Sequence, residues 1–371
     1  MKDVMGVINV VGRNSDLLGA LTGPRCIASV PFGGKYRLID FVLSSMANSG
    51  MQNVAVFTRE KYRSLMDHLG SGKNWDLSRK QDGLIILPPH SCDGQSLPDF
   101  DLKSFFAHRN FFDRSSQKIV VVASANIICN VYFREAVRYH QETGADITVF
   151  YSEMVANEGG PPRRCLKVNE TGRVLELVER QSWDQGTKVL LEIYILSKSL
   201  LMNLAEKSFL PGGADLLTGG IIPNLQKFNV CAYPLKGYSA VVDTIDLYYR
   251  HSMDLLCPQV WEELFFIPGL IHTKVKDEPP TRYLEGSAVA NSLLANGCTI
   301  AGTVENSILF RGVRVHRGAR VKNSVIMQKC EIGEGALVER VILDKDVRVS
   351  AGKALTGHDK KPLVVEKRKI V

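Results

Sequence analysis

Runs of apolar residues alternate with amphipathic segments over the first two thirds of the chain. Apolar runs, which predict buried parallel strands, occur at residues 4–10, 54–57, 84–87, 119–122 and 147–150. Apolar residues 39, 42, 43 and 46 have helical spacing, and Gly50 follows at the expected end of that helix. A second helix is expected at 131–143. This alternation predicts a parallel sheet with helices on both faces, and the short runs at 164–168 and 174–179 predict an antiparallel insertion.

A different period governs the last ninety residues. Val304, Val321 and Val338 lie 17 residues apart, and Gly318 and Gly335 have the same spacing. Seventeen residues is close to three six-residue steps, which predicts a hexapeptide parallel β-helix of triangular cross-section. Asn306 and Asn323 occupy equal positions in successive coils and are expected to form a hydrogen-bonded ladder, whose third position is Arg340.

These patterns divide the chain into three parts. Residues 1–258 are expected to form the α/β domain, and residues 282–371 the β-helix. Between them, residues 259–281 are expected to be a linker, because prolines recur at 258, 268, 279 and 280.

Composition narrows the class of protein. The 371 residues are 45% hydrophobic and 23% charged with a net charge of +7, which is too modest and too scattered to favour nucleic-acid binding. Eight cysteines without a CxxC pair predict reduced thiols in a cytoplasmic protein, with neither a metal site nor a disulfide framework. No apolar run approaches the roughly 20 residues of a membrane span.

The string Pro31–Phe41, PFGGKYRLIDF, is the most specific motif. It closely resembles the N-terminal signature of glucose-1-phosphate adenylyltransferases, and Ser307–Val315 in the predicted β-helix is also similar to that family. The resemblance implies a Rossmann-like (GT-A-like) nucleotidyltransferase domain with a mixed sheet, followed by a left-handed parallel β-helix. Members with activity convert ATP and glucose-1-phosphate to ADP-glucose and pyrophosphate and use Mg²⁺.

Nucleotidyl transfer needs cations that neutralise pyrophosphate and carboxylates that hold the metal ion. The resemblance places Leu17 at the family's loop arginine, Ile27 at its catalytic lysine, and Ala125 and Val241 at its two metal-binding aspartates. These apolar side chains supply neither function. Asp243 is two residues from the second aspartate position, so a small shift of register would restore it. The resemblance leaves only vestigial substrate-binding residues, namely Gly12, Glu179 and Arg180.

An intact scaffold beside a degraded site resembles the non-catalytic regulatory subunit (GlgD type) of this family. The resemblance implies no cofactor on this chain, and it implies a role in glycogen biosynthesis with a catalytic adenylyltransferase subunit as partner in a homo- or hetero-tetramer. An allosteric nucleotide or sugar phosphate is expected to bind at a cluster of Arg25, Lys35, Arg37 and Arg340.

Two alternatives remain open at this stage. One is a weakly active or divergent adenylyltransferase that uses Arg13, Arg180 and Asp243. The other is a stand-alone sensor of a nucleotide or sugar phosphate.

Overall fold

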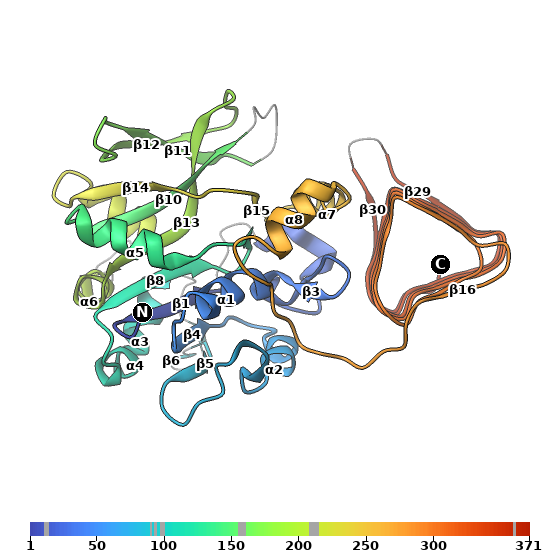
Figure 1. The fold of residues 1–371 in the computed structure, drawn as a ribbon, viewed down its shortest axis with the longest axis horizontal. Helices are drawn as coiled ribbons and strands as arrows, with labels where there is room; N and C mark the ends of the chain where they lie inside the picture. The colour runs from blue at the N-terminus through green and yellow to red at the C-terminus, as the bar shows by residue number, and fades with distance from the viewer. Residues whose placement is uncertain are drawn as a thin grey trace.

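The computed structural model describes residues 1–10, 15–89, 91–92, 95–96, 101–154, 161–207, 215–358 and 361–371. Figure 1 shows an α/β body beside a triangular prism that is seen end-on. The body contains a mixed sheet with the strand order β12-β11-β13-β8-β1-β4-β5, and β10 pairs with both β13 and β14.

The central strands of this sheet are parallel, as the apolar runs predict. β1 pairs with β4 and β8, and β4 pairs with β5, all in parallel. The bounds are Val4–Asn9 for β1, Asn53–Phe57 for β4, Gly83–Leu87 for β5 and Ile119–Ser124 for β8. Antiparallel pairing enters at β13, which lies between β8 and β10; the bounds are Ile147–Met154 for β10, Thr187–Ser197 for β13 and Val230–Pro234 for β14.

Helices cover both faces of the sheet, and each face has its own apolar core. One face carries α1 (Leu38–Asn48), α2 (Arg63–Leu69), α5 (Phe133–Glu142), α7 (Ile245–Asp254) and α8 (Pro258–Phe265). The other carries α3 (Asp101–Ala107), α4 (Arg109–Arg114) and α6 (Lys198–Lys207). Both expected helices are present, and Gly50 follows α1 with a φ of 85°, the left-handed backbone that glycine adopts readily.

Two smaller strand pairs extend the sheet towards the site. β11 (Arg163–Val168) and β12 (Val174–Arg180) form the expected antiparallel insertion. β9 (Ile127–Cys129) pairs with β15 (Ser239–Val241) just beyond the carboxyl end of β8. The remaining short pairs are β2 (Pro31–Phe32) with β3 (Tyr36–Arg37) and β6 (Ser91–Cys92) with β7 (Gln95–Ser96).

The prism is the expected parallel β-helix, built of three five-stranded sheets. Val304, Val321 and Val338 stack in register and are buried, which confirms the 17-residue period. One sheet holds β16 (Arg282–Tyr283), β19 (Thr299–Ile300), β22 (Arg314–Val315), β25 (Glu331–Ile332) and β28 (Arg348–Val349). The second holds β17 (Ala288–Ala290), β20 (Thr303–Glu305), β23 (Arg320–Lys322), β26 (Leu337–Glu339) and β29 (Ala354–Thr356). The third holds β18 (Leu293–Leu294), β21 (Ile308–Leu309), β24 (Val325–Ile326), β27 (Val341–Leu343) and β30 (Leu363–Val365).

The ladder along one corner of the prism combines one asparagine contact, in which Asn291 Nδ2 donates to Asn306 Oδ1 (2.7 Å), with a run of serines. The Oγ of Ser292, Ser307 and Ser324 each accepts a backbone N–H from the next coil, at 3.1, 3.0 and 3.1 Å. Asn306 and Asn323 have φ values of 45° and 47°, so these asparagines serve a left-handed turn, a conformation that asparagine tolerates better than most residues. Arg340 takes the same conformation at 55°.

The segment 259–281, expected as a linker, begins with most of α8. Leu264 and Phe265 of this helix are buried in the core of the α/β body. The rest of the segment lies along α1, where Asn48 Nδ2 donates to the Leu270 carbonyl (2.8 Å) and the His272 N–H donates to Ser44 Oγ (2.9 Å). Figure 1 shows it crossing from the body to the start of the prism.

No helix among the described residues is both long and apolar enough to cross a membrane.

A buried ion pair joins the two domains. Arg25 is 2% exposed, and its Nη2 donates to both carboxylate oxygens of Asp344 in the β-helix, at 2.9 and 3.0 Å. Its Nη1 donates to the Leu21 carbonyl. Around this pair the apolar core of the body continues into the prism through Phe310, Met327 and Ile342, among others.

A buried carboxyl group, Asp101, lies close to the carboxyl end of β1. It accepts hydrogen bonds from the backbone N–H groups of Leu102 and Leu216 and from the side-chain amide of Asn9. Burial raises the pKa of Asp101 to about 7, and the negative charges of Asp215 and Glu192 act in the same direction.

We predict that Arg25→Met destabilises the protein by about 3–5 kcal/mol, because it leaves Asp344 charged and buried without a partner. Urea unfolding measures this loss. The double variant Arg25→Met/Asp344→Leu should recover most of it, and Arg79→Met, which breaks the exposed pair with Asp76, should cost at most ~1 kcal/mol. A cost at Arg25 as small as that at Arg79 would contradict the structural role of the pair.

A second prediction concerns pH. The folded protein keeps a proton on Asp101 at pH values where the unfolded chain, with a pKa near 3.8, has lost it. The contribution of Asp101 to the free energy of unfolding therefore falls as pH rises from about 4 to about 7. Urea unfolding across this range should show that Asp101→Asn lacks this part of the decline, while the exposed Asp113→Asn follows the wild type. Parallel curves for Asp101→Asn and wild type would refute the assignment.

Candidate functional site

A pocket of about 340 Å³ lies beyond the carboxyl end of β8, between the β9–β15 pair and the β11–β12 insertion. In open α/β sheets this edge is the usual place for ligands. The polar side chains that line the pocket include Asn126, Arg163, Arg164, Glu179, Glu192 and Asp243.

Both arginines of this pocket are paired with carboxylates that also line it. Arg163 on β11 donates from Nη1 and Nη2 to the two carboxylate oxygens of Asp243, at 2.7 and 3.1 Å. Both side chains are largely buried, 15% and 5% exposed, so the pair is a strong bidentate contact. Arg164 Nη2 pairs with Glu179 Oε2 on the neighbouring strand at 2.9 Å, in a more exposed position. Both carboxylate oxygens of Asp243 therefore already accept hydrogen bonds from a guanidinium group.

The two expected metal positions carry no ligand atoms in their side chains. Ala125 is fully buried, and its backbone N–H donates to the Asn9 carbonyl. Val241 lines the pocket and pairs with Ile127 through the backbone. Magnesium prefers carboxylate oxygens, and within the described ranges no group of three His, Cys, Asp or Glu side chains is arranged to hold a metal ion. The residues at these positions do not fit Mg²⁺.

The positions of the family's loop arginine and catalytic lysine also carry uncharged side chains. Leu17 is exposed (53%) in the 3₁₀ segment Ser15–Leu21, and Ile27 is buried in the segment Ile27–Ser29. Gly12 and Arg13 lie outside the described residues. Glu179 is tied to Arg164, whereas Arg180 ends β12 as an exposed residue.

A second group of charges lies where the α/β body meets the prism. Arg37, at the start of α1, donates to the backbone carbonyl and the Oγ of Ser64, at 2.6 and 2.9 Å. Lys345 of the β-helix lies near it, and burial together with the positive charges of Arg37 and Arg25 lowers the pKa of Lys345 to about 7. The positive groups around the Lys345 ammonium therefore outweigh the negative charge of Asp344.

The same junction gathers further cations. The Lys35 ammonium lies over the Tyr36 ring (5.0 Å), and burial together with Arg311 lowers its pKa. Burial also lowers the pKa of Lys276, and Arg311 and Arg37 add to this effect. The junction cations, as they are called below, are Lys35, Arg37, Lys276, Arg311 and Lys345.

The expected phosphate cluster is thus rearranged. The structure brings Lys35 and Arg37 into this group but ties Arg25 to Asp344, where it holds the domains together. Arg340 lies at a corner of the prism. Its positive charge acts to lower the pKa of Tyr249 in α7, against the effect of burial. The structure thus gives Arg25 a contact between the domains, and the phosphate-binding role expected of Arg340 stays a prediction.

The sequence analysis does not predict three of the junction cations, namely Lys276, Arg311 and Lys345. The 17-residue period nevertheless contains a signal for Arg311 and Lys345. Arg311, Gln328 and Lys345 occupy equal positions in successive coils, as do Phe310, Met327 and Asp344. An aspartate at a position that is otherwise apolar marks a buried partner, and the residue after it faces the same neighbour. Arg163 had no comparable signal, because its partner Asp243 is 80 residues away.

The chain has clear relatives. The nucleotidyl transferase family model matches residues 18–227, and the model of the GlmU-like C-terminal hexapeptide matches residues 279–363. The chain is 39% identical to the glycogen biosynthesis protein GlgD of Bacillus subtilis (strain 168) over 98% of this chain and 96% of that protein. It is 42% identical to GlgD of Geobacillus stearothermophilus over 86% of this chain and 82% of that protein.

It is also 29% identical to the glucose-1-phosphate adenylyltransferase of Bacillus mycoides (strain KBAB4) over 92% of each chain. The resemblance found in the Pro31–Phe41 motif therefore extends over nearly the whole length. The chain belongs to the nucleotidyltransferase family of glucose-1-phosphate adenylyltransferases and the glycogen biosynthesis protein GlgD.

Proposed function

We propose that this protein is a regulatory subunit in glycogen biosynthesis that does not itself catalyse nucleotidyl transfer. In this proposal it pairs with a catalytic glucose-1-phosphate adenylyltransferase subunit, in a heterotetramer, and changes that subunit's rate or its response to effectors. The observation that carries the proposal is the Arg163–Asp243 pair, which lines the same pocket as Val241, one of the two residues that stand at the expected metal positions.

The physical argument concerns charge in the transition state. A reaction at the α-phosphorus needs cations and metal ligands whose charges are not already balanced by neighbours. Here the arginines of the pocket are balanced by carboxylates of the same chain. Removal of one stabilising donor typically costs about 10²–10³ in rate, and several are changed together here.

The same geometry weighs against a divergent enzyme that relies on Asp243. A metal ion at this carboxylate would have to displace a bidentate guanidinium from a site that is nearly closed to water. Such a displacement would leave Arg163 charged and unpaired beside the metal, which is strongly unfavourable. We therefore propose that this chain holds no Mg²⁺ of its own.

The junction cations support a regulatory site for an anion. They come from the α/β body, from the segment that precedes the prism and from the prism, so an anion there would contact all three parts. Asp344 pairs with Arg25, and Asp40 contacts His68 and the Arg37 N–H. Glu278 is the carboxylate that acts most strongly on Arg311. We propose that a phosphorylated metabolite or a nucleotide binds there through its phosphate groups.

We expect the purified chain to release no pyrophosphate from ATP and glucose-1-phosphate, and to change kcat or KM of a catalytic subunit when the two are mixed. A coupled pyrophosphate assay and size-exclusion chromatography of the mixture test both points. Asp243→Asn should modulate the catalytic subunit as the wild type does, because this carboxylate has no catalytic role. Robust turnover by the isolated chain that Asp243→Asn abolishes would establish the enzyme instead, and no complex with no kinetic effect would end the proposal.

Sulfate, whose charge is constant over the relevant pH range, is the probe for the junction cations. Bound sulfate favours the charged form of Lys345, so affinity should be highest below the pKa of about 7 and should fall as pH rises above it. Lys345→Gln should weaken binding at least about tenfold at pH 6, the effect of one charge-assisted hydrogen bond, and should flatten the pH profile.

The matched control is Lys353→Gln, which changes an exposed lysine elsewhere on the prism and should bind sulfate as the wild type does. Isothermal titration calorimetry gives the affinities. The charged groups that act on Lys345 are Arg25, Arg37, Asp344 and Lys367, and none of them is altered in these variants. Equal sulfate affinity in Lys345→Gln and wild type at pH 6 would exclude Lys345 from the site.

A further inference from the structure

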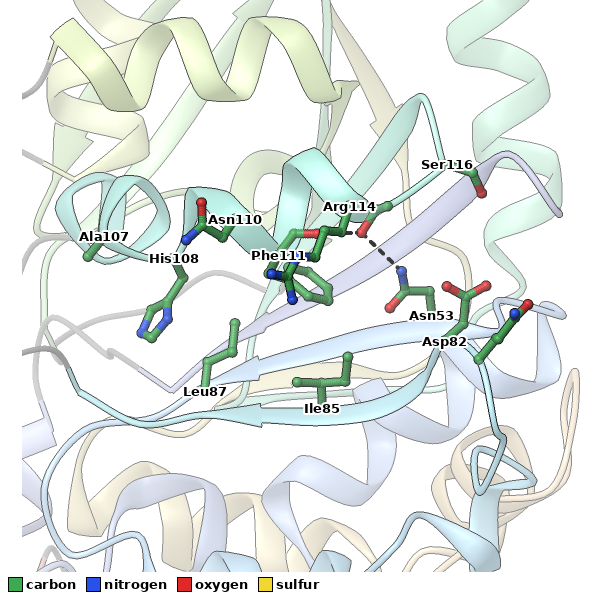
Figure 2. Close-up of a pocket in the computed structure, with 12 residues that line it drawn as sticks. Asn53, Asp82, Ile85, Leu87, Ala107, His108, Asn110, Phe111, Arg114 and Ser116 are labelled. Atoms are coloured by element: carbon green, nitrogen blue, oxygen red, sulfur yellow. Dashed lines mark hydrogen bonds between the residues drawn. The ribbon is translucent and has the colours of Figure 1, made fainter.

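A second cavity, of about 740 Å³, lies along β5, the last strand of the sheet order (Figure 2). It extends from Asp82, just before β5, to Leu87, the last residue of that strand, and α4 forms its other side. β1 and β4 separate this strand from β8, which carries the Arg163–Asp243 pocket at its end. Its size is typical of small-molecule sites, which range over roughly 300–1,000 Å³.

A buried acceptor without a donor faces this cavity. Asn53, the first residue of β4, is 2% exposed, and its Nδ2 donates to Ser115 Oγ (3.3 Å) and Gln117 Oε1 (3.0 Å). Its Oδ1 has no hydrogen-bond partner among the described residues. Figure 2 shows this oxygen turned towards the space between Phe111 and Ile85. An unsatisfied buried acceptor destabilises the folded protein, and a ligand with a suitable donor would remove this cost.

The orientation of the Asn53 amide follows from its neighbours. The Asp82 carboxylate can only accept, so Gln117 must turn its Nε2 towards Asp82 (3.3 Å). The Oε1 of Gln117 then faces Asn53 and requires a donor there, which places Nδ2 on that side. The Oδ1 of Asn53 is left pointing away from this chain of amides and into the cavity.

The other groups of the cavity divide into three kinds. Asp82 adds a carboxylate at the Asn53 end, and Arg114 of α4 supplies a guanidinium group; neither forms an ion pair within the described part of the chain, and both are exposed. Ile85 and Leu87 on β5 and Phe111 on α4 form apolar walls. Figure 2 shows Arg114 on the α4 side of the cavity, across from the two aliphatic side chains.

We propose that this cavity binds a small zwitterion with an apolar side chain, namely an aliphatic α-amino acid. Its ammonium group donates to Asn53 Oδ1 and to the Asp82 carboxylate, and its carboxylate accepts from the Arg114 guanidinium. Its side chain packs between Ile85, Leu87 and Phe111. A simple anion would leave the two acceptors unsatisfied, and a simple amine would leave Arg114 without a partner.

The experiment uses the full chain and L-leucine as the probe in isothermal titration calorimetry. We expect saturable binding of leucine. The analogue 4-methylpentanoate lacks the ammonium group and 3-methylbutylamine lacks the carboxylate, and each should bind at least about tenfold more weakly, the effect of about 1.4 kcal/mol. This comparison needs no variant, so it stands even where a substitution disturbs folding.

Two variants locate the binding. Arg114→Gln and Asp82→Asn should each weaken leucine binding about tenfold, and asparagine suits the left-handed backbone of residue 82, whose φ is 62°. Arg109→Gln and Asp113→Asn, at exposed positions of α4 outside the cavity lining, are the matched controls and should bind leucine as the wild type does.

Three results would overturn the proposal. They are no saturable leucine binding up to roughly 10 mM, above the ~1 mM of a weak specific site; equal binding of leucine and both analogues; and unchanged binding in both Arg114→Gln and Asp82→Asn. None of these measurements involves a catalytic subunit, sulfate or the Arg163–Asp243 pocket. The proposal therefore stands or falls independently of the proposed function.

Discussion

The buried ion pair between Arg25 and Asp344 lies where the α/β body meets the prism, and the arrangement of the two domains depends on it. Removing the charged groups of Arg25 and Asp344 from water costs free energy. This desolvation cost is offset only when both groups are hydrogen-bonded to each other and to the backbone. The apolar contacts around them have no such directional requirement. The ion pair therefore sets how the two domains face each other, and with it the positions of the junction cations.

Local periodicity was enough to predict most of the fold. The parallel strands, the α1 and α5 helices, the β11–β12 insertion and the coils of the prism follow from patterns in which the spacing of apolar residues reports burial directly. The sequence predicts a ladder of asparagines, whereas the structure has one asparagine contact beside a run of serines. The neighbouring residues share the same period, and sequence spacing does not say which side chain points inward. Most of α8 was assigned to a linker, because proline suits the first turn of a helix as well as a loop.

The charge pairs of the site are harder to predict from the sequence than the fold, for a physical reason. A missing ligand is visible in sequence, as at Ala125 and Val241, but the partner that balances a surviving charge is not. Arg163 meets Asp243 across 80 residues, and Arg25 meets Asp344 across 319. Such contacts depend on the tertiary fold, so a charged residue that seems available for a ligand is often already engaged. Lysines and arginines with shifted pKa values, such as Lys345, become apparent only when the surrounding surfaces are in place.

The repeat of the prism raises a problem of alignment. Successive coils present nearly identical backbones, so docking the prism one coil too high or too low would preserve most of its apolar contacts. The series Phe310, Met327, Asp344 breaks this degeneracy, because only the last member carries a charge. A displacement by one coil would set the thioether of Met327 against the guanidinium of Arg25 and leave both charges stranded in the dry interior. Asp344 alone thus selects one docking position of the prism out of several nearly equivalent ones.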